Sequence, residues 1–259
     1  MTVLLTHERF LPDFGGGGEE IVFQTASHLR DRGARVRVLT TGDPAITEYR
    51  GIPTDRLPVS RYRINFAAGA ISRAAAGFDL IHTFNYHACL PSWLAARRLG
   101  KPVVCTVLGL FRDAWRDMRG PLLGRCFAAW ERLLVRLPYT RTLFLSEYSR
   151  GQALACGVPE SRALVNTPGI DPAFFAASAP KDGSVLFAGK FEERKGVGDV
   201  LAVARALPAV RFRLAGWGPE EAAIRAAALP NVEMLGFLQA GELAQAYARA
   251  SVFLFPSRA

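Results

Sequence analysis

The sequence predicts an α/β protein built from two Rossmann-like domains. Short apolar runs of strand length alternate with longer amphipathic stretches in both halves, which is typical of parallel sheets covered by helices. A segment rich in Pro and Gly separates the two series and indicates a domain boundary. The 259 residues, 50% of them hydrophobic, are enough for two domains of ordinary size.

The first half contains five expected strands and four expected helices. The strands are Val3–Thr6, Val36–Thr40, Leu80–Phe84, Val103–Leu108 and Leu143–Ser146. The helices are Glu19–Arg32, Pro91–Leu99, Leu122–Leu137 and Glu147–Cys156. The stretch Gly42–Arg63 is rich in Gly, Pro and Arg and shows no clear period, so we expect it to be irregular.

The second half repeats the alternation more regularly. Its expected strands are Ser184–Ala188, Val210–Ala215, Val232–Leu235 and Val252–Phe255. Its expected helices are Val197–Leu207, Glu220–Leu229 and Glu242–Ala250. We therefore expect an amino-terminal domain at residues 1–170, a linker at 171–183 and a carboxy-terminal domain at 184–259.

Composition favours a cytoplasmic protein. The amino terminus meets charge almost at once, unlike a secretion signal, and no apolar run approaches the ~20 residues that span a bilayer. The four cysteines are far apart and form no C-x-x-C pair, which argues against a zinc site and a disulfide framework.

The positive charge is concentrated in the first half. Residues 1–170 hold 22 basic and 14 acidic side chains, whereas residues 171–259 hold 10 and 9. This excess favours an anionic partner, either a phospholipid surface or a phosphorylated acceptor. Nucleic acid is not expected, because the arginines are not clustered with aromatic residues in a recognisable binding module. An arginine-rich composition that only keeps the protein soluble is the alternative.

The first candidate site is the glycine loop Gly15, Gly16, Gly17 and Gly18, which follows the first strand and opens a helix. Glycines let the backbone approach a ligand closely, and a helix amino terminus offers unpaired N–H groups to an anion. The spacing fits neither G-x-G-x-x-G nor a Walker loop. A flexible surface turn is the alternative.

The second candidate is the run from Gly189 to Gly196, directly after a strand. Lys190, Arg194 and Lys195 lie where a helix begins, and cations there oppose the helix dipole unless they share an anion. A diphosphate held by Lys190 and Lys195 would resolve this conflict. The alternative is a solvated turn whose cations are neutralised by neighbouring carboxylates.

Two further groups lie at expected strand ends. Gly216 and Gly218 follow a strand of the second half and could equally form a tight turn. His82 and His87 flank Asn85 at the end of a central strand of the first half, where a histidine can act as a base or hydrogen-bond partner. A core histidine is the alternative. No Asp-x-Asp pair is present, so the sequence predicts no metal site.

Several motifs of the second half occur in a characteristic order. They are Phe187-Ala188-Gly189-Lys190, Arg194-Lys195-Gly196, Ala215-Gly216-Trp217-Gly218-Pro219, Val232–Phe237 and Tyr247–Ser257. In this order they resemble the carboxy-terminal domain of retaining glycosyltransferases of family 4, which have the GT-B fold. The first half is similar through the glycine loop, Asp79–His82, Ser146-Glu147, Gly157-Val158-Pro159 and Pro168–Asp171.

The resemblance implies a nucleotide-sugar donor and a lipid-linked or polysaccharide acceptor, with transfer that retains anomeric configuration. It assigns the donor diphosphate to Lys190, Lys195 and, from the other domain, the glycine loop. Gly189, Gly216, Gly218, Gly236 and Phe237 would lie near the nucleotide. No protein nucleophile, metal or other cofactor is implied, and His82 and His87 remain the only candidates for a catalytic group.

Three departures from the family qualify this expectation. Lys190 stands where Arg is usual, which keeps the charge but loses the guanidinium geometry. Leu108 stands where many members have His. The sequence ends at Pro256–Ala259, where the family continues with Glu-Gly-Phe-Gly and an acidic pair. We therefore expect an incomplete second domain and, as an alternative to an active enzyme, a truncated nucleotide-binding remnant.

The expected helix around Leu122–Leu137 suggests an additional partner. Residues 112–141 hold many arginines interleaved with Trp, Leu and Phe. Such a helix can lie on an anionic membrane, which would place the protein at the inner face of the membrane. The alternative is a helix that buries its aromatic residues in the domain core.

Overall fold

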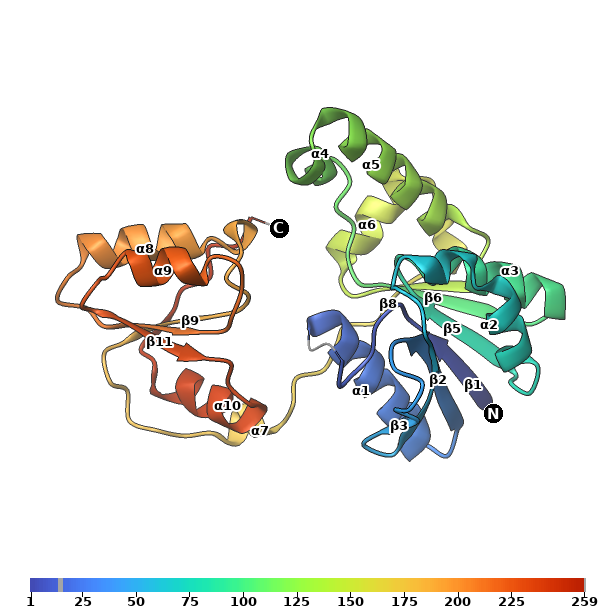
Figure 1. The fold of residues 1–259 in the computed structure, drawn as a ribbon, viewed down its shortest axis with the longest axis horizontal. Coiled ribbons are helices and arrows are strands. Elements are labelled where there is room, and N and C mark those ends of the chain that lie inside the picture. The colour runs from blue at the N-terminus through green and yellow to red at the C-terminus, as the bar shows by residue number, and fades with distance from the viewer. Residues whose placement is uncertain (14–15, 259) are drawn as a thin grey trace. The chain divides into compact units, whose positions relative to one another are not determined.

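The computed structural model describes residues 1–13 and 16–258 and divides the chain into two compact units, Met1–Pro168 and Gly169–Ala259 (Figure 1). Each unit has one sheet with helices packed on both faces. The predicted α/β class with parallel sheets is thereby confirmed.

The first unit contains an eight-stranded sheet in the order β3-β4-β2-β1-β5-β6-β7-β8, parallel except for the β3–β4 pair. The strands are β1 (Thr2–Thr6), β2 (Arg35–Thr41), β3 (Glu48–Tyr49), β4 (Ile52–Leu57), β5 (Leu80–Phe84), β6 (Val103–Val107), β7 (Arg141–Phe144) and β8 (Ala163–Val165). Strands β2, β3 and β4 lie on one side of β1 and strands β5 to β8 lie on the other, so the strand order reverses between β1 and β5. Ligands of open parallel sheets bind beyond the carboxyl ends of the strands at such a point.

Helices of the first unit cover the sheet on two faces. They are α1 (Gly17–Asp31), α2 (Ala68–Ala75), α3 (Cys89–Leu99), α4 (Ala114–Arg119), α5 (Pro121–Arg136) and α6 (Glu147–Ala155), with 3₁₀ turns η1 (Arg63–Phe66) and η2 (Glu160–Arg162). On one face, Val22, Phe23 and Ala26 of α1 pack against the alternate β1 residues Val3 and Leu5. The opposite face is covered mainly by α2, α3, α5 and α6. This two-sided burial explains the continuous apolar runs of the central strands.

The second unit has a parallel four-stranded sheet in the order β11-β10-β9-β12. Its elements are α7 (Ala173–Ala176), β9 (Val185–Ala188), η3 (Glu193–Lys195), α8 (Val197–Ala206), β10 (Phe212–Ala215), α9 (Glu221–Ala226), β11 (Val232–Gly236), α10 (Ala240–Arg249) and β12 (Val252–Phe253). Helices α8 and α9 lie on one face and α7 and α10 on the other (Figure 1). The reversal point of this sheet is between β9 and β12.

One expectation about the first half was wrong. The stretch Gly42–Arg63 is not irregular, because it contains β3 and β4. Strand β4 alternates buried and half-buried residues, but two of its buried side chains are the polar Thr54 and Arg56. Both side chains bond partners outside the strand, among them Ile46 O, and the strand carries no apolar run that the sequence could reveal.

The segment between the two series of elements packs with the second unit. Helix α7 contacts α10, and the Phe174 ring lies 6.0 Å from the Tyr247 ring. The compact units meet in sequence between Pro168 and Gly169.

Candidate functional site

The loops at the carboxyl edge of the second sheet are held together by backbone contacts. The Gly189 N–H donates to Ala215 O at 2.9 Å, and the Phe191 N–H donates to Trp217 O at 2.9 Å. These bonds continue the β9–β10 pairing beyond the strands. The loop after β9 and the loop after β10 therefore form one surface.

Glycine is required where these two loops touch. A Cβ on Gly216, which has a φ of +142°, would lie 1.9 Å from Gly189 O. A Cβ on Gly218 would lie 2.4 Å from Phe191 O. On Gly196, which has a φ of +75°, it would lie 2.2 Å from Pro256 O. Close backbone approach thus accounts for these glycines without a ligand.

Two lysine ammonium groups flank this surface. Lys190 Nζ lies 5.3 Å from the centre of the Trp217 ring, and Lys195 Nζ lies 5.4 Å from the centre of the Phe255 ring. Both lysines are half-buried, within reach of cation–π attraction. Burial lowers the pKa of Lys195, and the neighbouring charges of Arg194 and Lys190 lower it further, against the opposite effect of Glu192.

The remaining residues expected near the nucleotide lie at the same edge. The Gly216 N–H donates to Gly236 O at 2.8 Å, and Phe237 is exposed. The segment after β12 closes the edge from the other side, because the Arg258 N–H donates to Arg194 O at 2.8 Å. The structure therefore brings Gly189, Gly216, Gly218 and Gly236 together at the sheet edge that also carries Lys190 and Lys195. Sequence reasoning missed the aromatic partners Trp217 and Phe255, although both stand in loops that follow strands.

The glycine loop lies in the first unit. Gly15 is outside the described residues, Gly16 caps α1 in an extended conformation, and Gly17 and Gly18 begin the helix. A Cβ on Gly18 would lie 3.1 Å from Leu108 Cδ1, so Leu108 packs beside the loop. The first turn of α1 already carries the carboxylates of Glu19 and Glu20. They satisfy the helix dipole and weaken the case for an anion at this terminus.

His82 is a core residue. Its side chain is buried, its Nε2 lies 2.8 Å from Thr106 Oγ1, and its ring stacks on Phe84 at 4.7 Å. Burial lowers its pKa from 6.5 to about 4. A neutral, enclosed imidazole of this kind fits the structural alternative better than a catalytic one.

His87 lies at the carboxyl edge of β5, where ligands of such sheets bind. Its Nδ1 lies 3.1 Å from Asn65 Nδ2, and its ring meets the Tyr62 ring edge-on at 5.1 Å. Burial is the main cause of its lowered pKa; Glu8 raises this pKa, and Arg61 and His7 lower it. These neighbours come from η1, from the loop before it and from the loop after β1, and sequence reasoning missed them.

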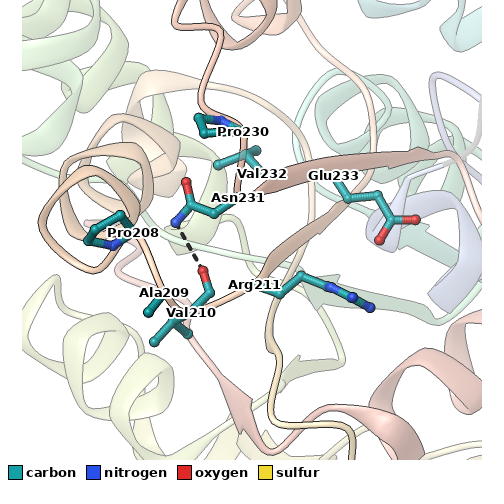
Figure 2. Close-up of a pocket in the computed structure, with 8 residues that line it drawn as sticks. All are labelled: Pro208, Ala209, Val210, Arg211, Pro230, Asn231, Val232 and Glu233. Carbon is teal, nitrogen blue, oxygen red and sulfur yellow. Dashed lines mark hydrogen bonds between the residues drawn. The ribbon is translucent and has the colours of Figure 1, made fainter.

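A hollow of about 250 Å³ lies at the opposite edge of the second sheet, where β10 and β11 begin (Figure 2). Asn231 Nδ2 donates there to Val210 O at 2.9 Å, and the same amide also bonds Ala204 O and Leu207 O. These bonds tie the α8–β10 turn to the start of β11. Because ligands of parallel sheets bind at the carboxyl edge, we do not assign the donor to this hollow.

Two negative findings concern only residues 1–13 and 16–258. There, no group of three or more His, Cys, Asp or Glu side chains is arranged to hold a metal ion. Within the same ranges, every helix is too short or too polar to cross a bilayer.

Comparison with known proteins identifies both halves. Residues 15–174 match Glycosyltransferase Family 4, and residues 182–259 match Glycosyl transferases group 1. The GDP-mannose-dependent alpha-mannosyltransferase of Mycobacterium tuberculosis (strain CDC 1551 / Oshkosh) is 29% identical, over 97% of this chain and 72% of that protein. The phosphatidyl-myo-inositol mannosyltransferase of Mycobacterium leprae (strain TN) is 27% identical, over 87% of this chain and 63% of that protein.

Solved structures support the fold. Anabaena Alr3699/HepE, solved in complex with UDP and glucose, superposes with a TM-score of 0.77 at 18% identity, covering 100% of this chain and 75% of that one. Sucrose-phosphate synthase from Thermosynechococcus elongatus superposes with a TM-score of 0.78 at 19% identity, covering 99% and 75%. At these identities the likeness shows the fold alone. With the family match, it establishes that the chain belongs to glycosyltransferase family 4 and has the GT-B fold.

Proposed function

We propose that the chain binds the diphosphate of a nucleotide-sugar donor at the Gly189–Gly196 loop. The observation that carries this proposal is the pair of half-buried ammonium groups of Lys190 and Lys195 beside the reversal point of the second sheet. A diphosphate would relieve the repulsion between these two cations. It would also stabilise the protonated form of Lys195, whose pKa is lowered in the free protein.

The same cations would assist the transfer. When the bond between sugar and diphosphate breaks, negative charge grows on the leaving diphosphate, and cations held in place stabilise that charge. Lys190 would act as a point charge, without the two-pronged geometry of arginine. We propose retention of configuration, as in the family, with no metal required at this loop. Gly16, Gly17 and Gly18 lie in the other unit, and their part in diphosphate binding stays a prediction.

Mannose from GDP-mannose is the first transfer to test, because the relative at 29% identity carries that name. The acceptor we propose is lipid-linked or a polysaccharide. Calorimetry with GDP, UDP and ADP and with their sugars would test donor binding, and mass spectrometry of acceptor mixtures would test transfer. We expect saturable binding of one nucleoside diphosphate, unchanged by EDTA. No binding of any nucleotide would contradict the proposal, and binding without transfer would favour a non-catalytic nucleotide-binding chain.

We also propose contact with an anionic membrane through α5. Leu122, Leu123 and Leu133 are exposed on this helix. The exposed Arg125 and Arg132 supply positive charge. The α4–α5 hairpin extends beyond the sheet of its unit (Figure 1). Apolar side chains flanked by arginines are typical of helices that lie in the plane of a membrane.

Vesicle flotation tests this contact. Binding should require anionic lipid and should weaken when Arg125 and Arg132 are both changed to Gln. Changing Arg97 and Arg98 to Gln, two exposed arginines of α3, is the matched control and should have little effect. Equal flotation with neutral vesicles, or equal loss in both variants, would contradict a role for α5.

A further inference from the structure

Two cysteine side chains meet in the core of the first unit. Cys89 begins α3, the helix that connects β5 to β6, and Cys105 lies in the middle of β6. Helix α3 packs back on the sheet and contacts β6. Cys89 Sγ therefore lies 3.6 Å from Cys105 Sγ, although the two residues are 16 positions apart in the sequence. Both thiols are free and buried, so the fold holds two unmodified sulfurs in contact.

A small hollow of about 10 Å³ lies beside the two cysteines. Tyr86, Leu110 and Glu131 line it together with Cys89 and Cys105. A hollow of this size has room for about one water-sized molecule. Hydrogen peroxide is close to water in size, whereas a bulky disulfide such as oxidised glutathione does not fit. The hollow therefore admits only a small oxidant to the pair.

Burial sets this pair apart from the other two cysteines. Cys126 is exposed on α5, and Cys156 is half-buried. Burial raises the pKa of Cys105, so its thiolate form is scarce and this sulfur should react slowly with a bulky reagent. A neighbouring sulfur changes the outcome of oxidation, because it captures an oxidised cysteine before a second oxidant molecule arrives.

We infer that Cys89 and Cys105 are a redox-sensitive pair, which a peroxide converts to a disulfide that joins α3 to β6. One thiol loses its proton and attacks an oxygen of hydrogen peroxide; the O–O bond breaks, the sulfur becomes a sulfenic acid, and the departing hydroxide takes up the proton. The second sulfur then attacks the oxidised one, the S–S bond forms, the S–O bond breaks and water leaves. Two thiols and one peroxide thus give one disulfide and two water molecules.

The disulfide should also shift the loop after β5. A disulfide holds its sulfurs about 2.05 Å apart, so those of Cys89 and Cys105 have to approach by roughly 1.5 Å. The Cys89 N–H donates to Tyr86 O at 3.4 Å, and Asn85 Nδ2 donates to Gly109 O at 2.9 Å. A close-packed core passes such a shift to its neighbours. Oxidation should therefore alter the loops after β5 and β6 at the carboxyl edge of the first sheet.

Mass spectrometry of the whole chain tests the pair. The folded chain is treated with hydrogen peroxide, its remaining thiols are blocked in denaturant with N-ethylmaleimide, and trypsin then separates Cys89 from Cys105 at Arg97 and Arg98. We expect a Cys89–Cys105 disulfide at least about tenfold more abundant than any intrachain disulfide of Cys126, because sulfurs in contact have a high effective concentration. Dithiothreitol should remove it. Absence of this disulfide, or an equal amount of Cys105–Cys126, would overturn the inference.

Oxidation of the unfolded chain is the matched control. Cys105 is separated from Cys126 by a length of chain similar to that from Cys89. In concentrated urea, the Cys89–Cys105 and Cys105–Cys126 disulfides should therefore form in amounts within about twofold of each other. The same preference for Cys89–Cys105 in folded and unfolded chains would show that proximity in sequence pairs the cysteines, and it would overturn a role for the fold.

Amide hydrogen exchange tests the effect on the loop after β5. Peroxide should change exchange at residues 86–88 by more than about twofold, because the first turn of α3 moves. Cys89→Ala and Cys105→Ala each remove one sulfur of the pair and should abolish this response to peroxide. Cys126→Ser keeps the pair and should respond like the unmodified chain. Unchanged exchange in a fully oxidised chain, or an equal response in Cys105→Ala, would contradict a switch at this position.

Discussion

The Tyr86 hydroxyl donates a hydrogen bond to Glu131 Oε2 at 2.7 Å. Glu131, a buried residue of α5, also accepts the backbone N–H groups of Phe111 and Arg112 and the indole N–H of Trp115, at 2.8–3.0 Å. One carboxylate thus joins α5, the loop after β5 and the loop after β6. The burial cost of the charge is offset by four donors, and two of these, the Phe111 and Arg112 N–H groups, belong to the loop after β6.

Glu131→Gln should therefore loosen this loop. The glutamine side chain would turn its own N–H groups toward the backbone and indole N–H donors that now bond Glu131. Some of these buried groups would then be unpaired, at a cost of about 1–3 kcal/mol. Tyr86→Phe, which removes a single donor, should cost about 1 kcal/mol. Amide hydrogen exchange at Phe111 and Arg112 measures the effect. Unchanged protection in Glu131→Gln would show that the carboxylate does not hold the loop.

Arg56 should hold in place the segment that precedes the glycine loop. Its buried side chain pairs with Asp13 at 2.6 Å and donates to Leu11 O and Ile46 O. Arg56→Met should lower the free energy of unfolding by roughly 1–3 kcal/mol, because the half-buried Leu11 and Ile46 carbonyls and the Asp13 carboxylate lose their donor. Arg37→Met on neighbouring β2, where the arginine forms an exposed pair with Asp55, should cost less than about 1 kcal/mol. Urea unfolding compares the two, and equal losses would contradict a special role for Arg56.

The contact between Gly216 and Gly189 gives a third prediction. Gly216→Ala should destabilise the second unit by about 2 kcal/mol or more, since the new methyl would meet Gly189 O and strain a φ of +142°. Gly241→Ala in α10 meets no atom within 4 Å and should stabilise the unit by about 0.5 kcal/mol. Thermal unfolding measures both changes. An unchanged melting temperature in Gly216→Ala would mean that the loops after β9 and β10 separate readily.

His82 should make stability depend on pH. Its pKa is about 4 in the folded chain and 6.5 otherwise, so the unfolded chain binds the additional proton between these values. Stability should therefore fall as pH drops from about 6.5 toward 4, by roughly 2–3 kcal/mol from this group. His82→Gln, which can still bond Thr106, should flatten the dependence of the urea midpoint on pH in that window. An unchanged slope would show that His82 is not buried as a neutral ring.

How much of the fold and of the candidate site the sequence predicts depends on how far apart in sequence the interacting residues lie. Apolar alternation predicts β5 at Leu80–Phe84 and α8 from Val197, because burial of these elements follows a local period. Apolar alternation does not predict β4, because its polar Arg56 is buried through contacts with other segments, among them Asp13 and Leu11. The positions of Lys190 and Lys195 in the loop after β9 also follow from the sequence, whereas their role at the donor diphosphate stays a prediction. The sequence does not predict the edge-on contact between the Tyr62 and His87 rings, since that depends on how separate loops pack.

The central claim is that the Gly189–Gly196 loop holds the donor diphosphate. The direct test is calorimetric titration of GDP and UDP into the chain, into Lys195→Ala and into Arg211→Ala, whose arginine lines the hollow at the opposite edge of the same sheet. Lys195→Ala should weaken binding of the preferred nucleotide by at least about tenfold, and Arg211→Ala should leave it unchanged. Unchanged affinity in Lys195→Ala, or loss in Arg211→Ala, would contradict the account.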